Sequence, residues 1–237
     1  MPVASIKASS VRVVFFGDSI CVGQGVSLYR GWVTRVAGRL DELAAGWGRE
    51  IIVTNASVNG STTRQALERM PYDVQSHGAD ILIVQFGLND CNYWLTDKGL
   101  PRVSPEGFAA NLKEMVRRGV KFGARTVFLH NNHPTTRDSQ KFPHSDVTYD
   151  ASNRQYNAIV REVARGLGPA VNFIDIEAEF DRFAGGQRDR LASLLLPDGL
   201  HLSAAGHALY FDLVCDKIVG AAKAIVSQGL GQGFGEG

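Results

Sequence analysis

Residues 11–20 read VRVVFFGDSI, a short apolar run followed at once by a glycine turn. The run Val11–Phe16 is too short for a helix and is nearly continuous in hydrophobicity, which is typical of a strand covered on both faces. Gly17, Asp18 and Ser19 then lie just past the carboxyl end of that strand. The stretch therefore predicts a buried parallel strand that delivers a polar turn to the edge of a sheet.

Four more apolar runs share the short length and continuous hydrophobicity of the first. They lie at Ile51–Thr54, Ile81–Phe86, Thr126–His130 and Val171–Ile176. Between the runs, apolar residues recur at helical spacing, in stripes that begin at Trp32, Phe108, Tyr156 and Leu209. This alternation favours an α/β fold in which a five-stranded parallel sheet has helices on both faces.

Helix caps and two interruptions refine this pattern. Ser104 stands before Pro105, which is typical of an N-cap followed by proline at the first helical position. Ser203 is placed to cap the last helix. The stretches 91–103 and 131–149 interrupt the alternation directly after strands, where open α/β sheets hold their ligand sites.

The length of the chain predicts a single domain. The 237 residues fit one α/β unit, and no shift in composition suggests a boundary. We expect this domain over residues 1–228. Residues 229–237 are rich in glycine and predict a disordered tail. The sequence does not predict an oligomeric state.

The composition argues against several classes of function. The 25 Lys and Arg residues nearly balance the 24 Asp and Glu, so the net charge of +1 predicts no binding to nucleic acid or to an anionic membrane. No apolar run reaches membrane-spanning length, and the first ten residues lack the apolar core of a secretory signal. The three cysteines form no disulfide or C-x-x-C pattern, so we expect a reduced, cytoplasmic protein.

Ser19 is a candidate nucleophile because it follows the first strand at the predicted mouth of the sheet. A serine hydroxyl needs a base within hydrogen-bond reach. His201 is the natural base, and Asp198 is spaced to orient its ring and to stabilise the imidazolium. Taken singly, each residue could be a helix cap or a surface side chain, but together they predict a catalytic triad.

Gly60 and Asn89 are candidate donors for an oxyanion hole. Glycine lets a backbone N–H approach a substrate closely, and asparagine supplies a neutral amide donor. The backbone N–H of Ser19 is the third candidate donor. The alternative for Gly60 and Asn89 is a purely structural role in turns.

The four motifs together resemble the sequence blocks of the SGNH hydrolase superfamily, also called GDSL-type esterases and lipases. They are Gly17-Asp18-Ser19-Ile20, Asn59-Gly60-Ser61-Thr62, Gly87-Leu88-Asn89-Asp90 and Asp198-Gly199-Leu200-His201, with isoleucine where the first block usually has leucine. The resemblance implies a flavodoxin-like three-layer α/β/α sandwich, a Ser19–His201–Asp198 triad and a three-donor oxyanion hole. It implies no cofactor.

Residues near the ends of the first, third and fourth strands are candidates for binding the substrate. They are Asp18, Tyr93, Trp94, His130, Asn131 and His133. Aromatic rings beside amides suit a sugar ring or a small polar alcohol, and no long apolar lid is evident. We therefore expect a serine carboxylester hydrolase that forms an acyl-enzyme on short acyl esters, with acetylated carbohydrate as the preferred class.

Several alternatives stay open at this point. An acyltransferase with the same triad, or a non-catalytic carbohydrate-binding module on this fold, fits the same motifs. Cys21 is a rival nucleophile, although a buried apolar role is the simpler interpretation. His130 and His133 have the spacing of a metal pair, but no third ligand is evident and we expect no metal.

Overall fold

The computed structural model describes residues 10–230 and contains one parallel sheet in the strand order β2-β1-β3-β4-β5. The strands are β1 (Ser10–Gly17), β2 (Glu50–Asn55), β3 (Ile81–Gln85), β4 (Thr126–His130) and β5 (Val171–Ile174). This order confirms the predicted five-stranded parallel sheet and is the flavodoxin-like order.

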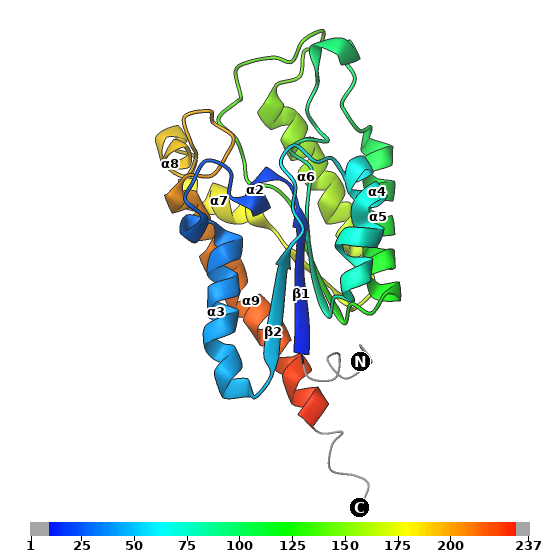
Figure 1. Ribbon diagram of the computed structural model, residues 1–237. Helices are drawn as coiled ribbons and strands as arrows, with labels where there is room; N and C mark the ends of the chain where they lie inside the picture. The colour runs from blue at the N-terminus through cyan, green and yellow to red at the C-terminus, as the bar shows by residue number, and fades with distance from the viewer. Residues whose placement is uncertain (1–9, 231–237) are drawn as a thin grey trace, which may run out of the picture.

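Helices cover both faces of the sheet (Figure 1). On one face α3 (Trp32–Trp47) packs against α9 (Ala204–Leu230), and the other face carries α4 (Thr63–Asp73), α5 (Pro105–Lys121) and α6 (Tyr149–Arg165). The shorter elements are α2 (Ser19–Val22), α7 (Ile176–Ala184), α8 (Arg188–Ser193) and the 3-10 turns η1 (Leu28–Arg30), η2 (Gln75–His77) and η3 (Leu95–Asp97). The arrangement confirms the three-layer sandwich.

The core lies where the central strands meet the helices on each face. All five residues of β3 are buried, as expected of a strand covered on both sides. Trp32 at the start of α3 packs edge-on against Phe15 and stacks on Tyr210 of α9, with ring centroids 5.4 and 4.4 Å apart. Each fully buried large apolar side chain contributes roughly 1.5–3 kcal/mol to the free energy of unfolding.

Several element boundaries follow from caps. The Ser104 and Ser203 side chains accept hydrogen bonds from the amides of Gly107 and Gly206, each at 3.2 Å, which confirms both predicted caps. The predicted extension of the fifth strand to residue 176 is wrong. The Asp175 side chain caps α7, so the strand ends at Ile174 and the helix begins one residue after the cap.

The ends of the described region limit two predictions. Helix α9 continues through Leu230, and the part of the predicted tail at 231–237 lies outside the described residues. Residues 1–9, on which the absence of a secretory signal was argued, also lie outside them. Within residues 10–230, no helix is long and apolar enough to cross a membrane. The domain boundary at residue 228 stays a prediction.

The strand order brings together the turns that carry the sequence motifs. The chain passes from β1 outward to β2 and then returns to β3 on the other side of β1. Open α/β sheets form a crevice at such a reversal, outside the carboxyl ends of the strands. The turns that follow β1, β2 and β3 therefore meet at one edge, and they contain three of the four motifs.

Candidate active site

Ser19 lies where β1 passes into the short helix α2. The Asp18 side chain caps that helix by accepting a hydrogen bond from the Ile20 amide at 3.0 Å. This cap holds Ser19 at the first helical position, where a backbone N–H has no partner within the helix. Ser19 is 7% exposed. The residue is thus held at the end of a buried strand, with only a small part of it exposed.

The turn at residues 198–201 brings a histidine to that hydroxyl. His201 Nε2 lies 3.1 Å from Ser19 Oγ, and His201 Nδ1 lies 2.6 Å from Asp198 Oδ2. The second oxygen of Asp198 accepts hydrogen bonds from the amides of Leu200 at 2.9 Å and His201 at 3.0 Å. The structure therefore brings the three predicted triad residues into one line of contacts.

The charge of Asp198 suits this arrangement. Burial acts to raise the pKa of Asp198, but the hydrogen bonds from His201 and Leu200 outweigh it and hold the pKa below its ordinary value. A charged carboxylate on Nδ1 keeps the proton on that nitrogen. His201 Nε2 is then free to accept the Ser19 proton.

The predicted oxyanion donors come from the ends of β1, β2 and β3. Gly60 lies in an exposed turn with φ of 74°, a left-handed conformation that glycine adopts without strain. The Val58 amide ties this turn to β1 by donating to the Gly17 carbonyl at 3.1 Å. Within residues 10–230, the amide N–H groups of Gly60 and Ser19 have no backbone hydrogen-bond partner.

Asn89 completes this set from the turn after β3. Its side chain is half-buried, and Nδ2 donates to Asp18 Oδ2 at 3.4 Å. An asparagine amide has two N–H groups, so one remains for a ligand. Ser19, Gly60 and Asn89 thus follow three neighbouring strands. Each has an N–H group that is available to a ligand.

Asp18 was predicted to bind substrate, and the structure corrects this prediction. The side chain is fully buried, where it caps α2 and accepts from Asn89. Burial, reinforced by nearby Asp90, raises the pKa of Asp18 from 3.8 to about 7. A residue that must cap the helix beginning at Ser19 points into the protein, so its role is to support the site.

Asp90 is a second buried carboxylate beneath the site. Its Oδ1 accepts hydrogen bonds from the amide and the hydroxyl of Thr63, at 2.9 and 2.5 Å. Burial raises the pKa of Asp90 to about 6, although the Thr63 hydrogen bonds oppose the shift. These contacts join the turn after β3 to the first residue of α4, a pairing for which the sequence contained no signal.

His130 and His133 were predicted at the mouth of the site, but both are fully buried. His130 Nδ1 lies 2.9 Å from the Tyr210 hydroxyl, and His133 Nε2 lies 2.8 Å from the Leu200 carbonyl oxygen. Burial lowers their pKa values to about 3 and about 4. The prediction that they contact substrate is wrong, because the chain after β4 packs inward against α9 and the turn at residues 198–201.

Asn131 is also buried and does not reach the mouth. Its Nδ2 donates to Asp175 Oδ1 at 2.7 Å, and its Oδ1 accepts from the Glu177 amide at 3.2 Å. The side chain therefore joins the end of β4 to the start of α7. The prediction of substrate contact is wrong for Asn131 for the same reason as for its neighbours.

Tyr93 and Trp94, by contrast, remain accessible on the loop after β3. The half-buried Tyr93 ring stacks on Phe142 with centroids 4.6 Å apart. Trp94 is 51% exposed, and the Arg102 guanidinium lies 4.1 Å from the centre of its ring. Their contact with substrate stays a prediction.

The sequence predicted no role for two arginines that contact the backbone of the motifs. Arg102 Nη1 donates to the Gly60 carbonyl at 3.2 Å, and Arg137 Nε donates to the Asp198 carbonyl at 2.8 Å. Each therefore supports the backbone of one motif from a neighbouring loop. An isolated arginine in a loop has no periodicity or motif that predicts such a contact.

The structure also places the side chains that suggested a rival nucleophile and a metal pair. Cys21 is buried, with Sγ 3.3 Å from Gln85 Oε1, and burial raises the pKa of its thiol well above the ordinary value. A thiol that stays protonated is a poor nucleophile. In the part of the chain that the structure describes, no group of three or more His, Cys, Asp or Glu residues is arranged to hold a metal ion.

The chain matches a known protein family over most of its length. The model described as the GDSL-like lipase/acylhydrolase family matches residues 15–209. This span includes all of the predicted triad and oxyanion residues. It covers most of the 237 residues of the chain.

Three curated proteins are similar in sequence. An arylesterase of Vibrio mimicus is 25% identical over 62% of this chain and 66% of its own length, and the esterase TesA of Pseudomonas aeruginosa is 26% identical over 69% and 72%. The lipoprotein YqeF of Bacillus subtilis is 26% identical over 86% and 88%. The match thus spans about two thirds of the length of the arylesterase.

Solved structures share the fold. The acetylxylan esterase Axe2 of Geobacillus stearothermophilus superposes with a TM-score of 0.69 at 22% identity, over 90% of this chain and 96% of that one. A lipase/acylhydrolase of Enterococcus faecalis gives a TM-score of 0.67 at 23% identity, over 89% and 96%. At these identities the likeness establishes the architecture.

Proposed function

We propose that this chain, which belongs to the GDSL-like lipase/acylhydrolase family and is a carboxylic ester hydrolase, cleaves short acyl esters through a serine triad. The observation that carries the proposal is the line of contacts from Ser19 Oγ to His201 at 3.1 Å and from His201 to Asp198 at 2.6 Å. A nucleophile, a base and an orienting carboxylate in this order are the requirements of acyl transfer.

The mechanism follows from the positions of these groups. His201 Nε2 takes the Ser19 proton as the hydroxyl oxygen attacks the ester carbonyl carbon. The N–H groups of Ser19 and Gly60 and the side chain of Asn89 stabilise the negative charge on the carbonyl oxygen. The alcohol leaves with the proton from His201. In the second step His201 takes a proton from water as the water oxygen attacks the acyl-enzyme, and the proton returns to Ser19 Oγ as the carboxylic acid leaves.

Two cavities beside the loops that carry the motifs favour a small polar substrate. A cavity of about 160 Å³ beside the turn after β3 is lined mostly by polar side chains, and a second of about 270 Å³ is lined by polar groups and Trp94. The exposed Trp94 face suits stacking on a sugar ring. Since one neighbour in fold is an acetylxylan esterase, we propose acetyl esters of carbohydrate as the preferred substrates.

The test is a paired assay of the wild type and Ser19→Ala on p-nitrophenyl acetate, butyrate and octanoate. We expect release that depends on Ser19 and declines as the acyl chain lengthens. Release that is equal in both proteins would contradict the proposed nucleophile. Release that increases toward octanoate would contradict the short acyl preference.

We also propose that the protein works in a reducing compartment, the cytoplasm. Cys21, Cys91 and Cys215 are all buried and unpaired, as is usual for proteins that are not oxidised. The Bacillus subtilis relative is a lipoprotein, so the location needs its own test. Detection of the native protein in the membrane fraction of its own cells would contradict this proposal.

A further inference from the structure

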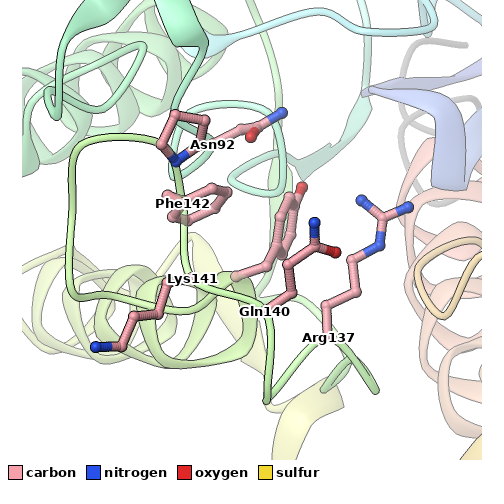
Figure 2. A pocket seen from close by; sticks show the side chains of 7 residues that line it. Asn92, Arg137, Gln140, Lys141 and Phe142 are labelled. Carbon is pink, nitrogen blue, oxygen red and sulfur yellow. The ribbon is translucent and has the colours of Figure 1, made fainter.

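A pocket of about 160 Å³ lies between the loops that follow β3 and β4 (Figure 2). Asn92 comes from the first loop, Arg137, Gln140 and Phe142 come from the second, and Tyr149 opens α6 behind them. None of the described residues that line the pocket carries a carboxylate. The lining thus combines amides and aromatic rings with positive charge.

Hydrogen bonds join this pocket to the catalytic residues on two sides. On one side, the Asn92 amide donates to the Asn89 carbonyl at 3.4 Å, and the Tyr149 hydroxyl donates to the Leu88 carbonyl. On the other side, Arg137 Nε donates to the Asp198 carbonyl at 2.8 Å. The pocket is therefore bordered by side chains that contact the backbone of the turn that carries Asn89 and of the turn that carries Asp198.

Arg137 brings a positive charge to this pocket, and its guanidinium lies 5.4 Å from the centre of the Tyr149 ring. Among residues 10–230, no carboxylate forms an ion pair with it. The nearby carboxylate of Asp150 pairs with Arg154 at 2.8 Å, and Asp138 pairs with Arg188. Nε is engaged, but within residues 10–230 the two terminal nitrogens of the half-buried Arg137 guanidinium make no hydrogen bond, so they can bind an anion.

The other cation of the lining is already engaged. Lys141 pairs with Asp146 at 2.7 Å, and Figure 2 shows its amino group pointing away from the other labelled polar groups. In this view the Gln140 amide and the Arg137 guanidinium lie on the opposite side from the Lys141 amino group, and the Asn92 amide lies above them. Arg137 is therefore the group that would pair with a bound anion, with the two amides as additional donors.

We propose that this pocket binds a carboxylate carried by the ester substrate, with Arg137 as the specificity-determining residue. A planar guanidinium pairs with a carboxylate through two parallel hydrogen bonds. The rings of Phe142 and Tyr149, 5.3 Å apart, provide an apolar wall for the carbon skeleton. The inference rests on the proposed esterase function and narrows it to short esters of a hydroxy acid or sugar acid, or of a dicarboxylic acid.

Two matched pairs of esters test this inference. The pair 4-acetoxybenzoate and its methyl ester places the carboxylate on the alcohol side. The pair mono-4-nitrophenyl glutarate and its methyl ester places it on the acyl side. The quantity to measure is the ratio of kcat/KM for the anionic ester to kcat/KM for the neutral one, since comparing this ratio between variants cancels the intrinsic reactivity of each ester.

We expect the ratio to fall about tenfold or more in Arg137→Ala and Arg137→Gln for one of the pairs, which also shows the side that enters the pocket. Arg137→Lys should retain part of the preference because it keeps the charge. Arg182→Ala, which removes an exposed arginine of α7 paired with Glu179, is the matched control and should leave the ratio unchanged.

The outcomes separate this inference from the proposed function. A ratio equal to that of the wild type in both Arg137→Ala and Arg137→Gln, for both pairs, would overturn the carboxylate pocket. Neutral esters cleaved in a Ser19-dependent way would then still support the esterase. Absence of Ser19-dependent cleavage of all four esters would overturn both.

Discussion

Two turns each place an aspartate beside Ser19, and the two aspartates are held in opposite ways. In the turn at residues 198–201, Asp198 receives hydrogen bonds from His201 and Leu200, and its pKa is held below the ordinary value. In the turn after β1, Asp18 is fully buried, and its pKa is raised to about 7.

The difference shows how one site assigns two roles to one residue type. A carboxylate that accepts several hydrogen bonds stays charged and can stabilise an imidazolium. A carboxylate whose burial outweighs its hydrogen bonds resists ionisation and serves as a structural partner. We therefore expect Asp198 to act on the chemistry through His201, and Asp18 to act on stability and on the position of Asn89.

The largest effect should come from Asp198→Asn. This variant keeps the shape of the side chain but removes the charge that holds the proton on His201 Nδ1, so we expect kcat to fall about 10³–10⁴-fold. The measurement is steady-state hydrolysis of p-nitrophenyl acetate. Near-wild-type turnover would show that Asp198 has no role in the triad. The proposed difference in role between Asp198 and Asp18 would then be wrong.

Asn89→Ala should lower kcat about 10²–10³-fold, because it removes one donor to the oxyanion. The effect should lie in kcat more than in KM, since the charge develops in the transition state. Asn172→Ala, at a mostly exposed position in the edge strand β5, is the matched control. An Asn89 variant as active as this control would refute the oxyanion assignment.

The prediction for Asn89 shows what the sequence could and could not reveal. Ser19, Gly60, Asn89 and His201 were found because each follows a recognisable strand or precedes a helix, and parallel strands bring such turns to one edge. The structure places His201 Nε2 3.1 Å from Ser19 Oγ, and the chemical roles of all four residues stay predictions. The five-stranded sheet was predictable for the same reason, since buried parallel strands are short and apolar throughout.

Three residues that were predicted to bind substrate are buried, and the reason is physical. His130 ends a strand, and Asn131 and His133 follow it, much as Asn89 follows β3, but their side chains turn inward to Tyr210, Asp175 and the Leu200 carbonyl. Whether a polar residue after a strand faces solvent or a packed helix depends on partners far along the chain.

Helix α4 was not predicted either, because its sequence TRQALERMPYD is mostly polar and contains Pro71.

A smaller effect is expected from Arg102→Ala. The guanidinium supports Gly60 through its carbonyl and packs over Trp94, so its loss should loosen the oxyanion turn and lower kcat about tenfold. Arg117→Ala, at an exposed position of α5, is the control. If both variants matched the wild type in kcat and KM, Arg102 would have no positioning role.

Asp18→Asn tests the structural role of Asp18 through the pH dependence of the free energy of unfolding. The folded-state pKa of Asp18 is raised above its unfolded value of 3.8 to about 7. The wild type therefore loses stability from this group as the pH rises through that window, by an amount on the order of a few kcal/mol. Asparagine mimics the protonated form, so the variant should gain relative to the wild type between pH 5 and pH 8 by about 1 kcal/mol or more.

Urea unfolding of both proteins at the two pH values measures this difference. Parallel pH dependence in the two proteins would show that Asp18 is ionised in the fold throughout. That result would place Asp18 with Asp198 as a second charged carboxylate.

The most direct test of the account is covalent labelling with a fluorophosphonate, followed by mass spectrometry of the peptide that contains Ser19. The reagent bonds only to a serine whose hydroxyl is activated by a base. We predict that the wild type is labelled at Ser19, and that His201→Ala, which keeps the hydroxyl but lacks the base, is not. No label on Ser19 in the folded wild type, or equal labelling in the two proteins, would contradict the claim that His201 activates Ser19 as the nucleophile.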